Sequence, residues 1–325
     1  MTARPTSPPR TTRTPAYVQV TTALRQLALT HPWSTDAPLP PENQLTERFA
    51  VSRGTLRRAT EELVREGLLS SEPGRGTFVV RKTQIRALIQ EELRLVARPD
   101  SRWHLDVSRF VPDFAGSERC HAAVRELAAY RGARTVFVTP DNSLRDLVRL
   151  ALDDGKDVLV PTYGLRRGMV LLRPEEIEPS TRPFAATLDG LERFGRVLDI
   201  PALDAVGAVD LLVTGATALT RAGLHIGGDN GYVDLEWGIL AELRLVAEHT
   251  PIVAVVHPVQ LVDLDLRPGP GEIGVDAIVT PDEVLTTART FSRPPGIRWA
   301  DVDERLLHDI PYLTELRRQA LTPRN

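Results

Sequence analysis

Hydrophobic positions near the N-terminus repeat at the spacing of two short helices. Leu45 and Phe49 lie four residues apart, so they share one face of a helix that begins after Pro40 and Pro41. A second helix is expected to begin at Ser52, whose hydroxyl can accept a hydrogen bond from a free amide of the first turn. Its buried stripe is predicted to be Leu56, Ala59, Thr60, Leu63 and Val64. The pattern therefore predicts two consecutive helices joined by a tight turn.

A hairpin is predicted directly after the second helix. Gly67 can adopt the left-handed conformation that ends a helix. Strands are expected over residues 68–72 and 77–80, and the turn between them reads Pro-Gly-Arg-Gly. Together with a bracing helix over 17–29, these elements predict a winged helix-turn-helix, an α+β fold.

The charged residues of this segment indicate that it binds DNA. Arg53 and Arg57 project from one exposed face of the second helix, with Arg58 beside them. The N-terminus of a helix favours phosphate, and an arginine fork in the major groove can read guanine. Two arginines on an isolated helix more often form a solvated face. Here the preceding helix, the turn and a basic Gly-Arg-Gly wing accompany them, and this combination favours DNA.

At these residues the sequence resembles the winged-helix DNA-binding domain of the GntR family of bacterial transcriptional regulators. The matching segments are Leu39-Pro40, Val51-Ser52-Arg53-Gly54-Thr55-Leu56-Arg57-Arg58-Ala59, Glu66-Gly67-Leu68 and Gly74-Arg75-Gly76-Thr77-Phe78-Val79. The resemblance implies DNA contacts from Ser52, Arg53, Thr55, Arg57, Arg58, Arg75 and Gly76. One segment departs from the family pattern, because Pro41, Glu42 and Asn43 stand where the family usually has Ser-Glu-Arg. The helix there loses its usual cap and one cation.

The chain is expected to contain three regions. Residues 1–15 are rich in Pro, Thr and Arg with almost no apolar side chain, which predicts a disordered arm. The winged helix-turn-helix is expected to occupy 16–81, and a second domain 82–325. Residues 1–82 hold 12 Arg and Lys against 7 Asp and Glu, whereas the remainder holds 28 against 36. The positive charge is therefore on the region that is predicted to bind DNA.

The second domain alternates short apolar runs with amphipathic helices. Strands are expected over 135–139, 157–161, 210–214, 252–256 and 277–280, and helices over 82–96, 118–131, 143–153 and 235–247. Buried strands separated by helices of this length predict an α/β fold with a doubly wound, mostly parallel sheet. Ligands of such sheets bind beyond the carboxyl ends of the strands.

A glycine-rich stretch, residues 223–237, lies between a predicted strand and a predicted helix. By itself such a stretch is more often a tight turn than an anion site. With its neighbours it resembles the 5-formyltetrahydrofolate cyclo-ligase (methenyltetrahydrofolate synthetase) family, in particular the branch with Asp-Leu-Glu-Trp after the glycines. The matches, in chain order, are Lys82-Thr83-Gln84-Ile85-Arg86, residues 111–116, Pro140-Asp141, Arg145, residues 151–161, 254–260 and 276–281.

The family's enzymes use ATP and magnesium, so the resemblance implies a ligand site. Its residues here would be Lys82, Arg86, Gly227, Gly228, Asn230, Gly231, Tyr232 and Asp234. His225, Gly228 and Asp229 replace an arginine, a cation and a glycine of the family's loop. Because these changes remove positive charge and add a carboxylate beside a polyphosphate, efficient ATP chemistry is not expected. A pocket for ATP or a folate-like ligand is expected to remain, with no cofactor assigned.

Other chemistry has little support in the sequence. The seven histidines show no metal-ligand spacing with one another or with Cys120, the single cysteine, and neither a P-loop nor a Gly-x-Ser-x-Gly motif is present. No catalytic or metal-binding residue is therefore assigned. One cysteine and no apolar stretch long enough to span a membrane predict a cytoplasmic protein.

The sequence as a whole predicts a transcriptional regulator that binds a double-stranded operator as a homodimer. Its second domain is expected to sense a small anionic ligand, nucleotide or folate-like, or to mediate dimerisation. The alternative is an ATP-dependent 5-formyltetrahydrofolate cyclo-ligase with an appended DNA-binding domain. A purely structural dimerisation domain with an empty pocket is a third possibility.

Overall fold

The computed structural model describes residues 15–30, 37–100, 106–107, 110–227, 231–264, 266, 268–269 and 271–321. The predicted arm therefore lies almost wholly outside the described residues. The chain divides into two compact units, Met1–Leu88 and Ile89–Asn325. The sequence placed this division after residue 81, whereas the structure places it within helix α4 (Arg81–Val96). The first turns of α4 belong to the N-terminal unit because they pack there: the amide of Gln84 donates to the carbonyls of Ala28 and Leu29, both at 3.0 Å.

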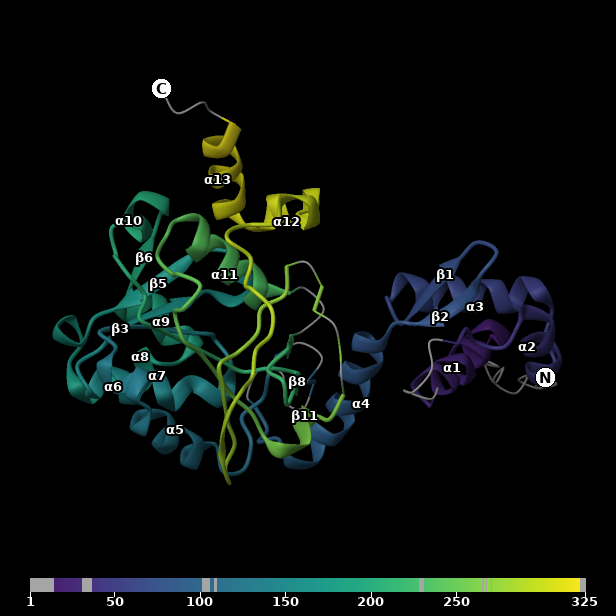
Figure 1. Cartoon of the computed structure of the whole chain (residues 1–325), viewed down its shortest axis with the longest axis horizontal. Helices are drawn as coiled ribbons and strands as arrows, with labels where there is room; N and C mark the ends of the chain where they lie inside the picture. Colours follow the sequence, from purple (N-terminus) through teal and green to yellow (C-terminus); the bar gives the residue numbers. More distant parts are fainter. Residues whose placement is uncertain are drawn as a thin grey trace, which may run out of the picture. The chain divides into compact units, whose positions relative to one another are not determined.

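The N-terminal unit is a winged helix-turn-helix (Figure 1). It comprises α1 (Ala16–Leu29), α2 (Glu42–Phe49), α3 (Arg53–Arg65), β1 (Leu69–Glu72) and β2 (Gly76–Val79), and the two strands pair antiparallel. Leu56, Ala59 and Leu63 of α3 are buried in its core, as predicted. Val64 was predicted in the same stripe but is 37% exposed, because α3 buries only the narrower face that these three residues share.

The second unit is built on an eight-stranded sheet in the order β13-β12-β10-β7-β3-β4-β5-β6. The five central strands are parallel and are those that the sequence predicted: β3 (Thr135–Val138), β4 (Asp157–Pro161), β7 (Leu211–Thr214), β10 (Ile252–Val255) and β12 (Ala277–Val279). The edges add antiparallel strands: β5 (Met169–Leu172), β6 (Arg196–Leu198) and β13 (Val284–Thr286). A separate small sheet contains β8 (Ala218–Thr220), β9 (His225–Ile226) and β11 (Leu261–Val262).

Helices cover both faces of the large sheet and form a core on each side (Figure 1). Along β3, Val136 and Val138 enter one core and Phe137 the other, as the alternation of side chains in a strand requires. The first core packs under α5 (Ser117–Glu126), α6 (Ala128–Gly132), α7 (Arg145–Asp153), α8 (Arg182–Ala185) and α9 (Leu188–Phe194). The second packs under α10 (Ile200–Asp204), α11 (Tyr232–Glu242), α12 (Glu304–Asp309) and α13 (Pro311–Leu321). The predicted doubly wound α/β fold is confirmed.

Two predicted helices differ from those observed. The helix expected over 118–131 is broken into α5 and α6, because Leu127 has an extended backbone (ψ 137°). The helix expected over 235–247 begins earlier, at Tyr232, and ends at Glu242, and Arg244 beyond it adopts a left-handed conformation (φ 59°). Within the described part of the chain, no helix has the length and apolarity needed to cross a membrane.

Candidate functional site

The first turn of α3 is held in place by a local hydrogen-bond pair. The hydroxyl of Ser52 accepts from the Thr55 amide at 3.2 Å and lies 2.9 Å from the Thr55 hydroxyl, which confirms the predicted N-cap. Ala50, in the preceding turn, has a left-handed backbone (φ 52°) that lets α2 and α3 meet within a short connection. Arg53, the first residue of α3, is exposed and has no ion-pair partner among the described residues. This end of α3 therefore presents one cation beside free helical amides.

The other two arginines of α3 make contacts within the N-terminal unit. The guanidinium of Arg57 makes a two-pronged ion pair with the carboxylate of Glu42 on α2, with Nε 3.1 Å from Oε1 and Nη2 3.2 Å from Oε2. The guanidinium of Arg58 lies 3.8 Å from the centre of the Tyr17 ring on α1. Arg57 and Arg58 thus tie α3 to its neighbours, and their predicted DNA contacts stay predictions.

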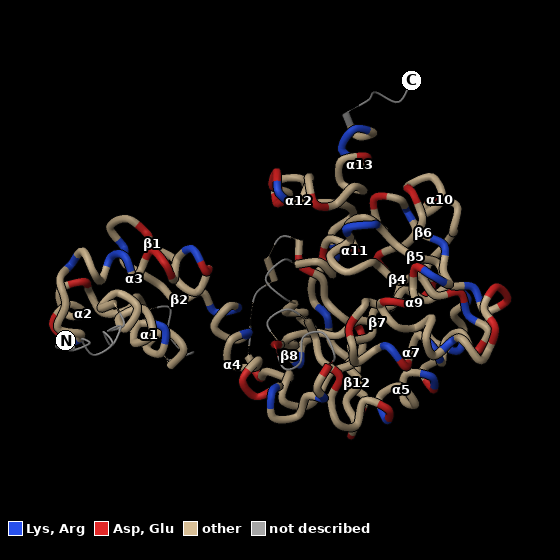
Figure 2. The backbone as a smooth tube through the Cα atoms, turned by 180° about the vertical axis from the view of Figure 1, so that it is seen from behind, with Lys and Arg blue, Asp and Glu red and all other residues tan. Residues whose placement is uncertain are grey.

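The wing brings a second basic side chain to the end of the hairpin. Arg75 is exposed, forms an ion pair with Glu72 and lies 5.5 Å from the centre of the Phe78 ring. Gly76 has a φ of 126°, and a Cβ there would lie 2.9 Å from the Cβ of Pro38. Glycine is therefore required at position 76 by its positive φ and by the close approach of the Pro38 side chain, a structural role besides its predicted DNA contact. Figure 2 shows basic positions along α3 and at this turn.

A cavity of about 370 Å³ opens at the carboxyl ends of the central strands of the second unit. It is lined by residues that follow β3, β4 and β7 and by the first turns of α11. In the sheet, β3 lies between β7 and β4, so the chain winds outward in opposite directions from this point. Such a switch point is where open α/β sheets bind their ligands. The fold therefore places the cavity where the sequence expected a ligand site.

Four of the predicted ligand-binding residues line this cavity: Gly227, Gly231, Tyr232 and Asp234. Gly231 begins α11 with a left-handed backbone (φ 57°), and Asp234 accepts a hydrogen bond from the Ile273 amide at 2.8 Å. Gly228 and Asn230 lie outside the described residues. Lys82 and Arg86 belong to α4 in the N-terminal unit, so their role in a site of the second unit stays a prediction.

Two further carboxyl groups that the sequence did not single out as ligand-binding residues also line the cavity: Glu236 is buried and Asp141 is partly buried. Asp141 follows β3 and accepts hydrogen bonds from the Thr139 hydroxyl and from the Gly215 amide at 3.0 Å. Burial raises the pKa of Asp141, against these hydrogen bonds. Glu236, on the second turn of α11, is only 3% exposed, and its Oε2 has no hydrogen-bond partner among the described residues. Burial raises the pKa of Glu236 well above its ordinary value, and the nearby Asp141 and Asp234 add to the increase.

Signals for both residues were present in the sequence. Asp141 lies two residues after a predicted buried strand, and Glu236 is the glutamate of the Asp-Leu-Glu-Trp segment. A carboxyl at either place lies at the edge where the sheet binds ligands. What the sequence could not supply was their proximity, because the two residues lie far apart in the chain.

The described lining offers little positive charge for a polyphosphate. Asp141, Asp234 and Glu236 contribute three carboxyl groups, whereas Arg305 is the one cationic side chain among the described lining residues. Arg305 is 74% exposed, with its Nε 3.8 Å from Asp309. His225, which also lines the cavity, replaces the family's arginine, and its Nε2 lies 2.9 Å from the Gly215 carbonyl. The ATP and magnesium that the family implies are therefore poorly matched by this lining.

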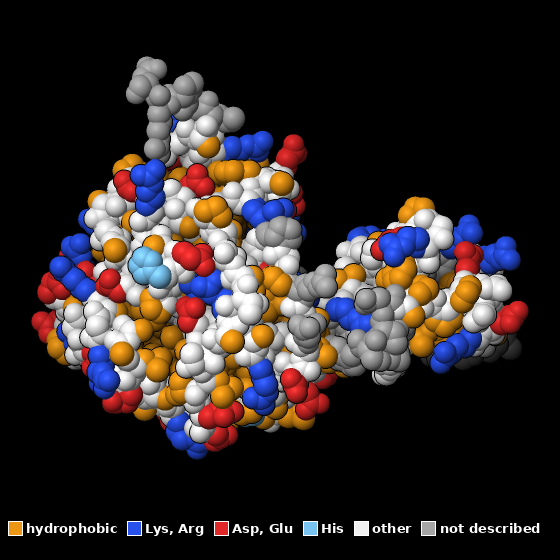
Figure 3. Space-filling view, in the orientation of Figure 1, with side chains coloured by type: hydrophobic (Ala, Val, Ile, Leu, Met, Phe, Trp, Pro, Cys, Tyr) orange, Lys and Arg blue, Asp and Glu red, His pale blue; other side chains and the backbone are white. Residues whose placement is uncertain are grey.

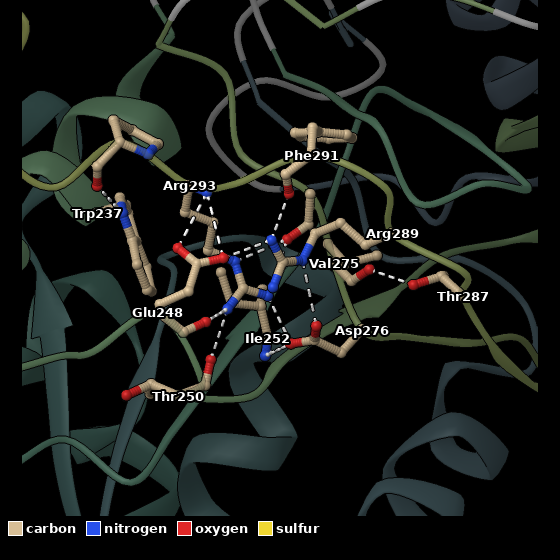
Figure 4. A network of polar contacts seen from close by, with 12 residues as sticks. Trp237, Glu248, Thr250, Ile252, Val275, Asp276, Thr287, Arg289, Phe291 and Arg293 are labelled. Carbon is tan, nitrogen blue, oxygen red and sulfur yellow. Dashed lines mark hydrogen bonds and ion pairs between the residues drawn. The ribbon is translucent and has the colours of Figure 1, made fainter.

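Residues 289–294 pack against helix α11, which carries Asp234 and Glu236 (Figure 4). The indole of Trp237, on α11, donates to the Pro294 carbonyl at 2.8 Å and lies 5.0 Å from the Arg293 guanidinium. Arg293 is fully buried and donates to the carbonyls of Gly274, Glu248 and Thr250 and to the carboxylate of Asp276. Burial lowers the pKa of Arg293, against the attraction of Asp276. This network fixes one side of α11.

Comparisons with known proteins agree with both units. The model of the bacterial regulatory proteins of the gntR family matches residues 16–79, and that of the 5-formyltetrahydrofolate cyclo-ligase family matches residues 79–281. A methenyltetrahydrofolate synthase domain-containing protein of Mus musculus is 35% identical over 214 residues, 64% of this chain and 56% of that protein. The chain thus spans about half the length of such curated relatives.

The N-terminal unit has relatives of its own. The HTH-type transcriptional repressor NagR of Bacillus subtilis (strain 168) is 40% identical over 74 residues, 23% of this chain and 30% of that protein. The crystal structure of AraR(DBD) in complex with operator ORR3 is 41% identical, with a TM-score of 0.19, and the match covers 20% of this chain and 80% of that one. The chain therefore belongs to the 5-formyltetrahydrofolate cyclo-ligase family, and its residues 16–79 form a domain of the gntR family of bacterial regulatory proteins.

Proposed function

We propose that this protein is a sequence-specific transcriptional regulator of the GntR type that binds double-stranded operator DNA. The observation that carries the proposal is the capped N-terminus of α3, where Ser52 accepts from Thr55 and Arg53 stands exposed in the first turn. A helix end of this kind can enter the major groove, where its amides favour phosphate and an arginine reads guanine. A relative named as a transcriptional repressor supports the same function.

The surface charge of the second unit also favours the assignment of DNA binding to the N-terminal unit. On the face that Figure 3 shows, acidic and basic side chains alternate over its surface. DNA affinity comes mainly from concentrated positive charge. The N-terminal unit, with the basic residues of α3 and the wing, is therefore the part we assign to DNA.

The second unit senses a small ligand at the cavity between the ends of β3 and β7. A cavity of about 370 Å³ lies in the size range of small-molecule sites. The protein acts as a homodimer, because two winged helices are needed to occupy half-sites one helical turn, ~34 Å, apart. Ligand binding would change operator affinity through a coupling free energy of ~1–3 kcal/mol. Dimerisation by the second unit without a ligand is the competing role.

A ligase carrying a DNA-binding domain is the competing function. Its support is the family itself and relatives named for a methenyltetrahydrofolate synthase domain. Against it stands a lining with three carboxyl groups and one exposed arginine, which does not favour polyphosphate. We therefore infer a regulator in which this fold binds a ligand and does not consume ATP.

Replacement of Arg53 by alanine tests the proposed function. Full-length protein is used to select its operator from random DNA, and fluorescence anisotropy then gives the dissociation constant of each variant. Arg53→Ala should weaken operator binding by ~1–3 kcal/mol, because the base or phosphate contact is lost. Arg65→Ala is the matched control, since Arg65 ends the same helix and pairs with Glu62. Equal operator affinity in the Arg53 variant and the unchanged protein would refute the assignment of α3 as recognition helix.

A further inference from the structure

Glu236 is the most unusual polar group of the cavity. Its side chain is almost fully buried, and its Oε2 has no hydrogen-bond partner among the described residues. A buried oxygen without a donor costs stability, so proteins rarely keep one without a use. Glu236 is also one of the residues that line the cavity. The position of this oxygen therefore indicates a ligand that supplies the missing donor.

The charged groups around Glu236 indicate which charge of ligand the cavity favours. Asp141 and Asp234 lie near enough to raise its pKa, and among the described lining residues only Arg305 is a cation. A cation would favour the charged form of Glu236 and attract it strongly in this buried setting, whereas an anion would find only the exposed Arg305 as a cationic partner among the described lining residues. The positive end of the α11 dipole would favour an anion, but Asp234 in the first turn of the helix offsets it. The electrostatic balance favours a positively charged ligand.

A metal ion fits this lining less well than an organic cation. In the part of the chain that the structure describes, no three His, Cys, Asp or Glu side chains are arranged to hold a metal ion. A cavity of about 370 Å³ also leaves room for a molecule of several heavy atoms. Planar amidine and guanidine groups carry a positive charge and present two parallel N–H donors, the geometry that matches a carboxylate.

We propose that the cavity binds a small organic cation of the amidine or guanidine class, which donates its paired N–H groups to the Glu236 carboxylate. This deepens the proposed sensing function and rests on it, and it reverses the anionic ligand that the sequence suggested. In the empty cavity, burial favours the neutral acid. A bound cation favours the carboxylate, so binding releases a proton to the solvent.

Three compounds of nearly equal shape test the charge directly: benzamidine, benzamide and benzoate, which are cationic, neutral and anionic at pH 7. Each is titrated into the full-length protein by isothermal calorimetry, in two buffers of different ionisation enthalpy. Benzamidine should bind tightest and benzoate weakest, and the heat with benzamidine should depend on the buffer because a proton is released. Glu236→Gln should weaken benzamidine roughly 10- to 100-fold, the loss of one charge-assisted contact. Glu126→Gln, which changes an exposed carboxylate, should leave binding unchanged.

Several outcomes would overturn the proposal. These are tighter binding of benzoate or ATP than of benzamidine, equal benzamidine binding in the Glu236→Gln protein, displacement of benzamidine by Mg²⁺, or no binding of any of the three compounds at millimolar concentration. Folding of the Glu236→Gln protein is checked by its thermal unfolding midpoint. Failure here is distinct from failure of the proposed function, because the Arg53→Ala measurement of operator binding does not involve the cavity.

Discussion

Replacement of Arg293 tests whether the polar network around this residue stabilises the second unit. Its side chain is fully buried, and its guanidinium donates to three backbone carbonyls and to Asp276 (Figure 4). Asp276, the residue just before β12, in turn accepts a hydrogen bond from the Ile252 amide of β10 at 2.9 Å. The network therefore also joins the beginnings of these two neighbouring strands. We predict that Arg293→Met, which keeps the aliphatic stem and removes the charge, destabilises the second unit strongly.

The magnitude follows from what the substitution leaves behind. Asp276 would lose its buried partner, and the carbonyl oxygens of Gly274, Glu248 and Thr250 would lose their donors. Asp276 is 39% exposed and keeps Arg289, so most of the cost comes from the buried carbonyl oxygens, each ~1–3 kcal/mol when left without a donor, and we expect a total of ~3–5 kcal/mol. For a unit of this size each kcal/mol moves the unfolding midpoint by roughly 2–4 °C, so we expect a fall of roughly 6–20 °C. Arg293→Lys keeps the charge but loses the fork of donors, so it should recover only part of this loss.

Thermal unfolding of the full-length protein, followed by tryptophan fluorescence and circular dichroism, measures the effect. The matched control is Arg298→Met, because Arg298 is 40% exposed and pairs only locally with Asp301. Its free energy of unfolding should change by less than ~1 kcal/mol. Benzamidine binding should weaken in the Arg293→Met protein, since α11 loses the contact between Trp237 and Arg293. A change below ~1 kcal/mol in Arg293→Met would refute the conclusion that this network stabilises the unit.

Three further predictions concern protonation, DNA affinity and catalysis. Burial raises the pKa of Glu236 in the folded protein above its unfolded value of about 4.3, so stability falls as pH rises from there through the folded pKa. The free energy of unfolding in urea, measured between pH 5 and 8, should therefore depend less on pH in Glu236→Gln than in the unchanged protein, and it should be higher in the variant at pH 8. An equal pH dependence in the two proteins would contradict the conclusion that Glu236 is a buried acid with a raised pKa. Glu42→Gln should release Arg57 for phosphate and raise the slope of log affinity against log salt by about 0.9, measured by anisotropy on non-specific DNA. An unchanged slope would show that Arg57 does not reach the DNA. The full-length protein should form no 5,10-methenyltetrahydrofolate from 5-formyltetrahydrofolate with ATP and Mg²⁺, and steady turnover would establish the ligase instead.

The N-terminal unit was readable from the sequence because its determinants are local. Ser52 caps the helix that it precedes, and Leu56, Ala59 and Leu63 repeat at the period of the helix that buries them. The central strands were also readable, because strands buried on both faces appear as continuous apolar runs. Strands β5, β6 and β13 were missed, since they are short antiparallel additions at the edges of the sheet.

Tertiary structure alone decided the chemistry of the cavity. The chain order does not show that Asp141, after β3, and Glu236, on α11, face the same space. Nor does it show that Arg293 is buried and contacts Trp237 of α11, because an arginine followed by two prolines is typical of an exposed loop. The sequence by itself determined the winged helix-turn-helix and the five central strands of the α/β domain, since propensity, capping and periodicity act over a few residues. The charge of the cavity depends on side chains that only the winding of the sheet brings together, and desolvation, which sets their protonation, exists only once they are buried.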